Sequence, residues 1–151
     1  MEDFCAVYRE CYPRVLAYVA SHAGKQLAED ITSETFTIAW RKLGQMPSNA
    51  LPWLLGIARN LVREAHRQAR HDELVDSPAD DDFAVVELRE ALHSLSAADQ
   101  EVLTLIAWHG LTSAEAAQVL GCSTATFFVR LHRARRRLRS ALSTPAFERA
   151  R

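Results

Sequence analysis

The chain has 151 residues, of which 48% are hydrophobic and 25% are charged, and its formal net charge is -1. This length suffices for one ordinary domain or two small ones, and the composition predicts packed cores and excludes a wholly disordered chain. The histidines and acids are scattered and form none of the common catalytic motifs, so we expect no enzyme, no metal site and no cofactor.

Charge is distributed unevenly along the chain. Residues 1–71 carry nine Lys or Arg against seven Asp or Glu, residues 72–90 carry one against eight, and residues 91–151 carry eight against four. An acidic segment therefore lies between two basic ones, an asymmetry that the net charge hides.

The three cysteines form no CxxC pair, which suits a reducing compartment. We expect all three to be small buried hydrophobic residues. There is no signal peptide and no run long enough to enter a membrane, so the sequence predicts a cytoplasmic protein without membrane insertion.

Two helices are predicted in the first part of the chain. Apolar residues recur every three or four positions over residues 3–22 and again over residues 28–43, with a helix stop around Gly24. Pro13 lies inside the first pattern and is expected to kink or divide the helix, because proline lacks an amide donor and crowds the preceding turn.

A loop and a basic helix follow. Residues 44–52 contain two prolines and a glycine, which predicts the loop, and helical periodicity resumes from residue 53 to about residue 70. The polar face of this third helix is basic, and Trp40 and Trp53 lie near it in the sequence. Basic charge beside aromatic rings is what a protein needs to hold single-stranded nucleic acid. The alternative is that both tryptophans are core residues.

Residues 72–87 are predicted to be a linker, because they contain seven acids and few large apolar residues. A new helical pattern covers residues 88–95. Ser96 is expected to cap the next helix, with Asp99 three residues later, and that helix is expected to continue to Gly110.

Residues 112–138 are typical of a helix-turn-helix. Thr112 or Ser113 can cap the first helix, Gly121 can end it, and Ser123 or Thr124 can cap the second. The second helix has an apolar stripe, formed by Phe127, Leu131, Ala134 and Leu138, and six arginines between residues 130 and 139. No acid between Glu115 and Glu148 balances them, so phosphate-binding charge is predicted. The alternative is a solvated surface helix.

Three segments, in order, resemble the extracytoplasmic-function (ECF) group of bacterial RNA polymerase sigma factors. AEDITSETFTIAWRKL is similar to the helix that docks on the polymerase, and WLLGIARNLVREAHR is similar to the helix that reads the melted minus-10 element. LSAADQEVLTLIAWHGLTSAEAAQVLGCSTATFFVRLHRARRRL is similar to sigma domain 4. The resemblance covers residues 4–142.

The resemblance implies an all-α fold with two small helical domains. Sigma domain 2, a three-helix-type bundle, is expected over residues 1–71 and sigma domain 4 over residues 88–143, with the acidic linker at 72–87 and a C-terminal tail at 144–151. The implied function is transcription initiation: the protein binds core RNA polymerase, through the largest-subunit coiled coil and the flap, and directs it to promoter DNA. An anti-sigma factor is a further candidate partner.

The resemblance also assigns site residues. The polymerase-binding residues are Asp30, Ile31, Ser33 and Glu34. The minus-10 residues are Asn49, Trp53, Arg59, Asn60, Arg63 and Arg67. The residues for the duplex minus-35 element are Ser123, Thr124, Thr126, Phe128, Val129, Arg130, Arg133 and Arg137.

The chain departs from the family pattern at Phe128 and Val129, where family members usually carry polar, base-facing residues. Apolar side chains cannot form bidentate hydrogen bonds, so reading is expected to shift towards thymine methyl groups, groove shape and nearby arginines. The alternative is that the pair faces a protein, such as an anti-sigma factor. Two rival functions also remain: a helix-turn-helix transcription regulator, and a polymerase-binding or anti-sigma-binding module that does not open promoters.

Overall fold

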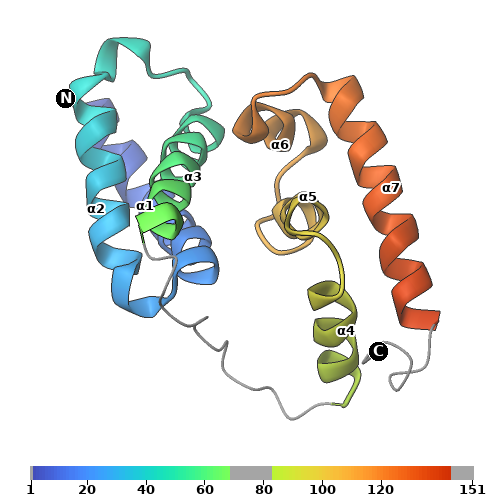
Figure 1. The fold of residues 1–151 in the computed structure, drawn as a ribbon. Helices are drawn as coiled ribbons and strands as arrows, with labels where there is room; N and C mark the ends of the chain where they lie inside the picture. The colour runs from blue at the N-terminus through green and yellow to red at the C-terminus, as the bar shows by residue number, and fades with distance from the viewer. Residues whose placement is uncertain (1, 69–82, 144–151) are drawn as a thin grey trace. The chain divides into compact units, whose positions relative to one another are not determined.

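The structure, a computed structural model, describes residues 2–68 and 83–143. Within these ranges the chain forms seven α-helices and one short 3-10 helix, which confirms the predicted all-α class. The helices form two compact units, one built of α1 to α3 and the other of α4, α5, α7 and most of α6 (Figure 1). The predicted tail at 144–151 and residues 72–82 of the predicted linker lie outside the described residues.

The N-terminal unit is a bundle of α1 (Glu2–Ala23), α2 (Lys25–Arg41) and α3 (Ala50–Gln68), each packed on the other two. Buried apolar side chains from all three helices form its core, among them Val15, Tyr18, Val19, Ala28, Ile31, Phe36, Ala39, Leu54, Ala58 and Val62. Full burial of a large apolar side chain contributes about 1.5–3 kcal/mol, so this shared core is what holds the bundle together.

Pro13 does not divide α1, which runs uninterrupted from Glu2 to Ala23. The expected break is absent because the amide that proline lacks would have bonded to the carbonyl of Arg9, and both residues are exposed. Water can hydrate that carbonyl, so the helix continues.

Gly24 separates α1 from α2, as predicted. Its φ of 86° lies in the left-handed region, and its amide donates to the carbonyl of Ala20 at 3.1 Å. The second helix begins at Lys25, three residues before the predicted start at residue 28, because its first turn exposes Lys25, Gln26 and Leu27 and so lacks apolar periodicity.

The loop between α2 and α3 is shorter than predicted. Leu43–Gln45 forms the 3-10 helix η1, and α3 begins at Ala50, so Pro52 belongs to the first helical turn. A proline there removes only an amide that would have no intrahelical partner, and the helix therefore tolerates it.

The C-terminal unit contains α4 (Phe83–His93), α5 (Ala97–Ala107), α6 (Ser113–Leu120) and α7 (Thr124–Ser143). The long helix α7 packs on α4 and α5, and side chains such as Leu92, Val102, Leu105, Phe127, Leu131 and Ala134 are buried. Residues 83–87, predicted as linker, are the first part of α4. Six of the seven acids that predicted the linker lie in residues 72–82, and residues 83–87 contain only Glu87, so the acid count does not apply to the start of α4.

The cysteines differ from the prediction. Cys5 is exposed, and Cys11 and Cys122 are half-buried, so none is fully buried. Burial raises the pKa of the Cys11 thiol, with the Glu10 carboxylate adding to the effect and Arg14 opposing it. A thiol with a raised pKa is a weak nucleophile at neutral pH. In the part of the chain that is described, no helix has the length and apolar character to cross a membrane.

Candidate nucleic-acid interface

Three local devices fix the two ends of α6 and the start of α7. Thr112 and Glu115 form a reciprocal capping box, in which the Thr112 amide donates to Glu115 Oε1 at 3.0 Å and the Glu115 amide donates to Thr112 Oγ1 at 3.1 Å. Gly121 ends α6 with a φ of 71°. Ser123 caps α7 by accepting from the amide of Thr126 at 3.1 Å. The sequence signals for the helix-turn-helix are thereby confirmed.

The inner face of α7 is the predicted apolar stripe. Phe127, Leu131 and Ala134 are buried and Leu138 is half-buried. The stripe faces the core, and the rest of the α7 surface exposes Phe128 by 55% and Val129 by 49%. The predicted minus-35 residues Thr124, Thr126, Arg130 and Arg133 are exposed on the same helix.

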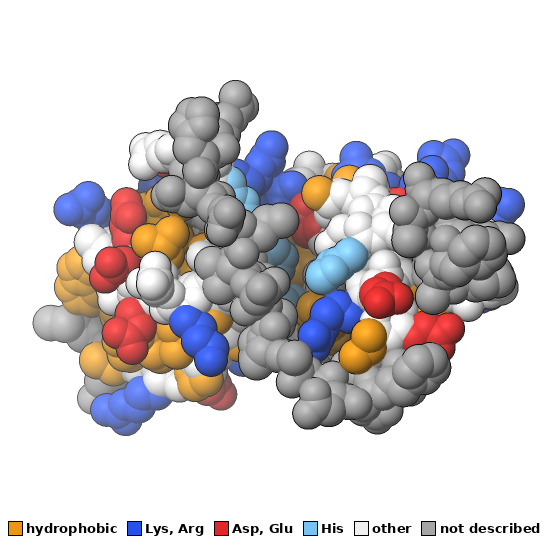
Figure 2. Space-filling model, turned by 60° about the horizontal axis from the view of Figure 1, so that its bottom comes forward, with side chains coloured by type: hydrophobic (Ala, Val, Ile, Leu, Met, Phe, Trp, Pro, Cys, Tyr) orange, Lys and Arg blue, Asp and Glu red, His pale blue; other side chains and the backbone are white. Residues whose placement is uncertain are grey.

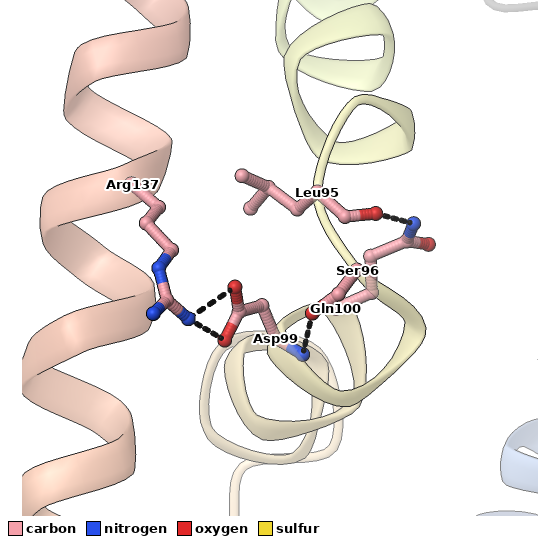
Figure 3. Close-up of polar contacts among 5 residues, drawn as sticks. All are labelled: Leu95, Ser96, Asp99, Gln100 and Arg137. Carbon is pink, nitrogen blue, oxygen red and sulfur yellow. Dashed lines mark hydrogen bonds and ion pairs between the residues drawn. The ribbon is translucent and has the colours of Figure 1, made fainter.

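Arg137 is engaged within the unit. Its Nη1 donates to Asp99 Oδ1 at 3.0 Å and to Oδ2 at 2.9 Å, which ties α7 to α5 (Figure 3). Asp99 is 8% exposed, so the ion pair is partly shielded from water. The partner Asp99 lies outside the stretch between Glu115 and Glu148, so proximity in sequence did not reveal it. The side chain of Arg137 is 58% exposed, and its assignment to the minus-35 residues stays a prediction.

Asp99 has a second role that the sequence did indicate. Its amide donates to Ser96 Oγ at 3.2 Å, so Ser96 caps α5 as predicted (Figure 3). The helix itself is shorter than expected, because it ends at Ala107 and Gly110 follows with a φ of 65°. No sequence signal linked Asp99 to α7.

On α3, four of the predicted minus-10 residues share one face. Trp53, Asn60 and Arg67 follow at intervals of seven residues and Arg63 lies one turn before Arg67, which places the four along one side of the helix. We call this set the α3 row. Trp53 is half-buried and the other three are exposed.

The remaining two predicted minus-10 residues lie at the margins of the α3 row. Asn49 is exposed and immediately precedes the helix, whereas Arg59 is half-buried at the side, one turn before Arg63. The six residues therefore form one row with two flanking positions.

Trp40 does not belong to the α3 row. Its ring packs edge-on against Phe4 of α1, with centroids 5.0 Å apart, in a cluster of aromatic rings that also contains Tyr8, Tyr12 and Phe36. The ring is nevertheless 46% exposed, so Trp40 is a partly exposed member of the α1–α2 seam.

The polar face of α2 exposes three of the four predicted polymerase-binding residues. Asp30, Ser33 and Glu34 are exposed and lie three or four residues apart, and Thr37 continues the same face. We call Asp30, Ser33, Glu34 and Thr37 the α2 row. Thr37 was not in the predicted set and joins the row here by its spacing from Ser33 alone. In Figure 2, exposed acidic side chains are interspersed with hydrophobic ones on the face shown.

Ile31 is a correction to the predicted polymerase-binding set. Its side chain is only 7% exposed and belongs to the core of the bundle. Helical geometry explains the error: a residue next to Asp30 in sequence lies about 100° around the helix, on the buried side with Ala28 and Thr35.

Comparison with known proteins finds a matching family model for each of the two units. The family model "Sigma-70 region 2" matches residues 7–71, and the model "Sigma-70, region 4" matches residues 86–138. Over 152 residues the chain is 33% identical to the ECF RNA polymerase sigma factor SigC of Mycobacterium tuberculosis, and this match covers 89% of the chain and 79% of SigC.

Two further similarities point to the same group of proteins. The chain is 38% identical over 135 residues to the probable RNA polymerase sigma factor RfaY of Xanthomonas campestris, covering 76% of the chain. The sigma factor RpoE of Bartonella quintana, crystallised with the anti-sigma factor NepR, matches with a TM-score of 0.70 and 29% identity, covering 95% of this chain and 99% of RpoE. The chain spans 34% of the length of RfaY and 48% of the length of a further curated relative, the ECF RNA polymerase sigma factor BldN of Streptomyces coelicolor. From these matches, the chain belongs to the ECF family of RNA polymerase sigma factors.

Proposed function

We propose that this chain is a transcription initiation factor that binds core RNA polymerase and directs it to specific promoters. In this proposal the α2 row docks on the coiled coil of the largest subunit, the α3 row with Asn49 and Arg59 holds the melted minus-10 element, and α7 enters the duplex minus-35 element. The observation that carries the proposal is that two separate units of a sigma-family chain each expose a basic helix face, on α3 and on α7.

The chemistry of the two faces suits different forms of DNA. A tryptophan beside arginines fits single-stranded DNA, because unstacked bases pack on aromatic rings while cations follow the backbone. A helix-turn-helix with exposed arginines fits duplex DNA, whose major groove admits one α-helix.

The test is run-off transcription with core polymerase and a pool of promoter fragments. A sigma factor yields transcripts that start at a defined position, and core polymerase alone does not. A helix-turn-helix regulator would instead bind duplex DNA without polymerase and yield no transcript. A chain that binds polymerase but starts no transcript would fit the non-opening module, and the proposal would then be wrong.

The docking surface is tested by charge reversal at Glu34. Glu34→Arg should weaken binding to core polymerase at least about tenfold, because it places a cation where an acid meets a basic partner surface. The matched control is Glu10→Arg, the same change at an exposed residue of α1 outside the α2 row. Fluorescence anisotropy with labelled protein measures both affinities. Equal affinities for the two variants would remove the α2 row from the interface.

An anti-sigma factor is the third partner in the proposal. The sigma factor RpoE was crystallised with the anti-sigma factor NepR, and the structure of CnrH was solved in complex with the cytosolic domain of CnrY. We expect a protein captured by this chain from its own cells to suppress run-off transcription when it is added back. Capture without suppression would not qualify as an anti-sigma factor.

A further inference from the structure

The N-terminal half of α7 exposes an apolar patch made of Ala125, Phe128 and Val129. Phe128 is 55% and Val129 is 49% exposed, and Ala125 lies one turn before both. At about 100° per residue, Val129 lies opposite the buried stripe of α7 and Phe128 lies beside it, so about half of each residue is open to a partner. An exposed aromatic and a β-branched residue side by side indicate a surface that meets a partner.

Arginines follow the apolar patch along α7. At about 100° per residue, Arg133 and Arg135 lie on either side of its line about one to two turns further on, while Arg136 and Arg139 continue its own face about two and three turns further on. All four are exposed. A partner that covers the patch therefore also meets positive charge on both sides. The two phosphate backbones that border a DNA groove carry the matching negative charge. The charge thus favours duplex DNA over an apolar protein surface.

The hydroxyl of Ser123, which lies beside the patch, is occupied within the chain. Ser123 accepts from the Thr126 amide at 3.1 Å and donates its own hydroxyl proton to Thr126 Oγ1 at 2.9 Å. Ser123, one of the predicted minus-35 residues, thus has no proton left to give to a base. Ala125, Phe128 and Val129 have no polar side-chain atom. The patch itself can therefore offer a base only apolar contact.

Only one base presents an apolar group in the major groove: thymine, through its C5 methyl. We propose that Phe128 and Val129 recognise thymine methyl groups in the minus-35 element, an inference that rests on the proposed function. The stretch from Ala125 to Val129 spans about 6 Å along the helix, at 1.5 Å per residue. That length corresponds to roughly two base-pair steps of about 3.4 Å. The recognised thymines should therefore occupy one to three adjacent positions.

The experiment uses the holoenzyme, assembled from full-length chain and core polymerase, and a promoter fragment pool randomised in its minus-35 region. One pool is synthesised with thymine and a second with uracil, which keeps every Watson–Crick and groove hydrogen bond but lacks the methyl. We expect the thymine pool to be enriched in thymines at one to three adjacent positions, and the uracil pool to lose that enrichment. On the best selected duplex, each thymine-to-uracil change at those positions should weaken binding about three- to fivefold.

Protein variants assign the effect to the patch. Phe128→Ala and Val129→Ala should each weaken binding to the thymine duplex and become less sensitive to uracil. Leu142→Ala, which truncates an exposed apolar residue at the far end of α7, should keep the full sensitivity. The substituted side chains are largely exposed, so the fold should survive, and far-UV circular dichroism checks this. The uracil duplexes test the inference on the unaltered protein as well.

The outcomes separate the inference from the proposed function. If the holoenzyme starts no transcript and selects no sequence, the proposed function is wrong and the inference is overturned with it. If it selects a minus-35 sequence equally well from both pools, only the inference is overturned. If both patch variants select and bind duplexes like the unaltered chain, the patch serves a protein partner and the inference is again overturned.

Discussion

Gly121 ends α6 in a conformation that other residues adopt only with strain, since its φ is 71°. A Cβ at this position would meet no atom within 4 Å, so backbone conformation alone disfavours a side chain. The left-handed region costs a non-glycine residue about 1–2 kcal/mol, partly offset by the lower entropy of its unfolded chain. Gly121→Ala should therefore lower the free energy of unfolding by about 1 kcal/mol, measured by urea denaturation.

Gly44 provides the matched control for Gly121. A Cβ there also meets nothing within 4 Å, but its φ is not in the left-handed region. Gly44→Ala should leave stability unchanged or raise it by up to about 1 kcal/mol, since alanine restricts the unfolded chain more than glycine does. If both variants lose the same stability, then strain at Gly121 is not the cause.

Single residues whose role is local were predictable from the sequence. Gly24, Ser96 and Gly121 each act through their own backbone or through a neighbour three or four residues away, and such signals are written in consecutive letters. Arg137 was not predictable in this way. Its partner Asp99 lies 38 residues earlier, and only the packing of α7 on α5 brings the two together.

At the scale of helices, the ion pair between Arg137 and Asp99 holds α7 against α5. The partners differ in environment: the side chain of Arg137 is 58% exposed, whereas that of Asp99 is 12% exposed. Removing the arginine leaves a carboxylate that is poorly hydrated, which costs about 1–3 kcal/mol. Exposure of Arg137 weakens the pair, so the lower half of that range applies.

Arg137→Ala should thus destabilise the C-terminal unit by about 1–2 kcal/mol in urea denaturation. The matched control is Arg136→Ala, an exposed arginine of the same helix, which should change stability by no more than about 0.5 kcal/mol. Both substitutions remove one positive charge and both favour helix. An equal loss of stability in the two variants would mean that the loss comes from the change in net charge and not from the contact with Asp99.

Helix positions were predicted better than helix ends. Periodic apolar residues mark a buried face, and α1, α2, α3 and α7 all follow such a pattern. Ends differ because they depend on solvent exposure: α2 begins on an exposed turn, and Pro13 is tolerated where water replaces a lost hydrogen bond. Periodicity includes Ile31 in the apolar pattern of residues 28–43 and so indicates a buried side chain, as the structure has it. The error came from the resemblance, which named Ile31 as polymerase-binding without information on burial.

At the scale of the whole molecule, each unit contains fully buried side chains of its own. Tyr18 and Leu54 are among the largest of them in the N-terminal unit, and Leu105 and Phe127 in the C-terminal unit. Such cores favour independent folding, although units of this size are only marginally stable. We expect fragments 1–77 and 78–151 to be helical separately, with far-UV circular dichroism spectra that add up to the spectrum of the intact chain.

Core substitutions in the intact chain test the same independence without cutting it. Leu54→Ala should destabilise the N-terminal unit by about 2–5 kcal/mol and Leu105→Ala the C-terminal unit by a similar amount, because each leaves a cavity at a fully buried position. Hydrogen exchange resolves the two units residue by residue. Each substitution should speed exchange only in its own unit, since each unit contains fully buried side chains of its own. Faster exchange in both units with either variant would show that they unfold as one, and the helical fragments would then be expected to unfold on separation.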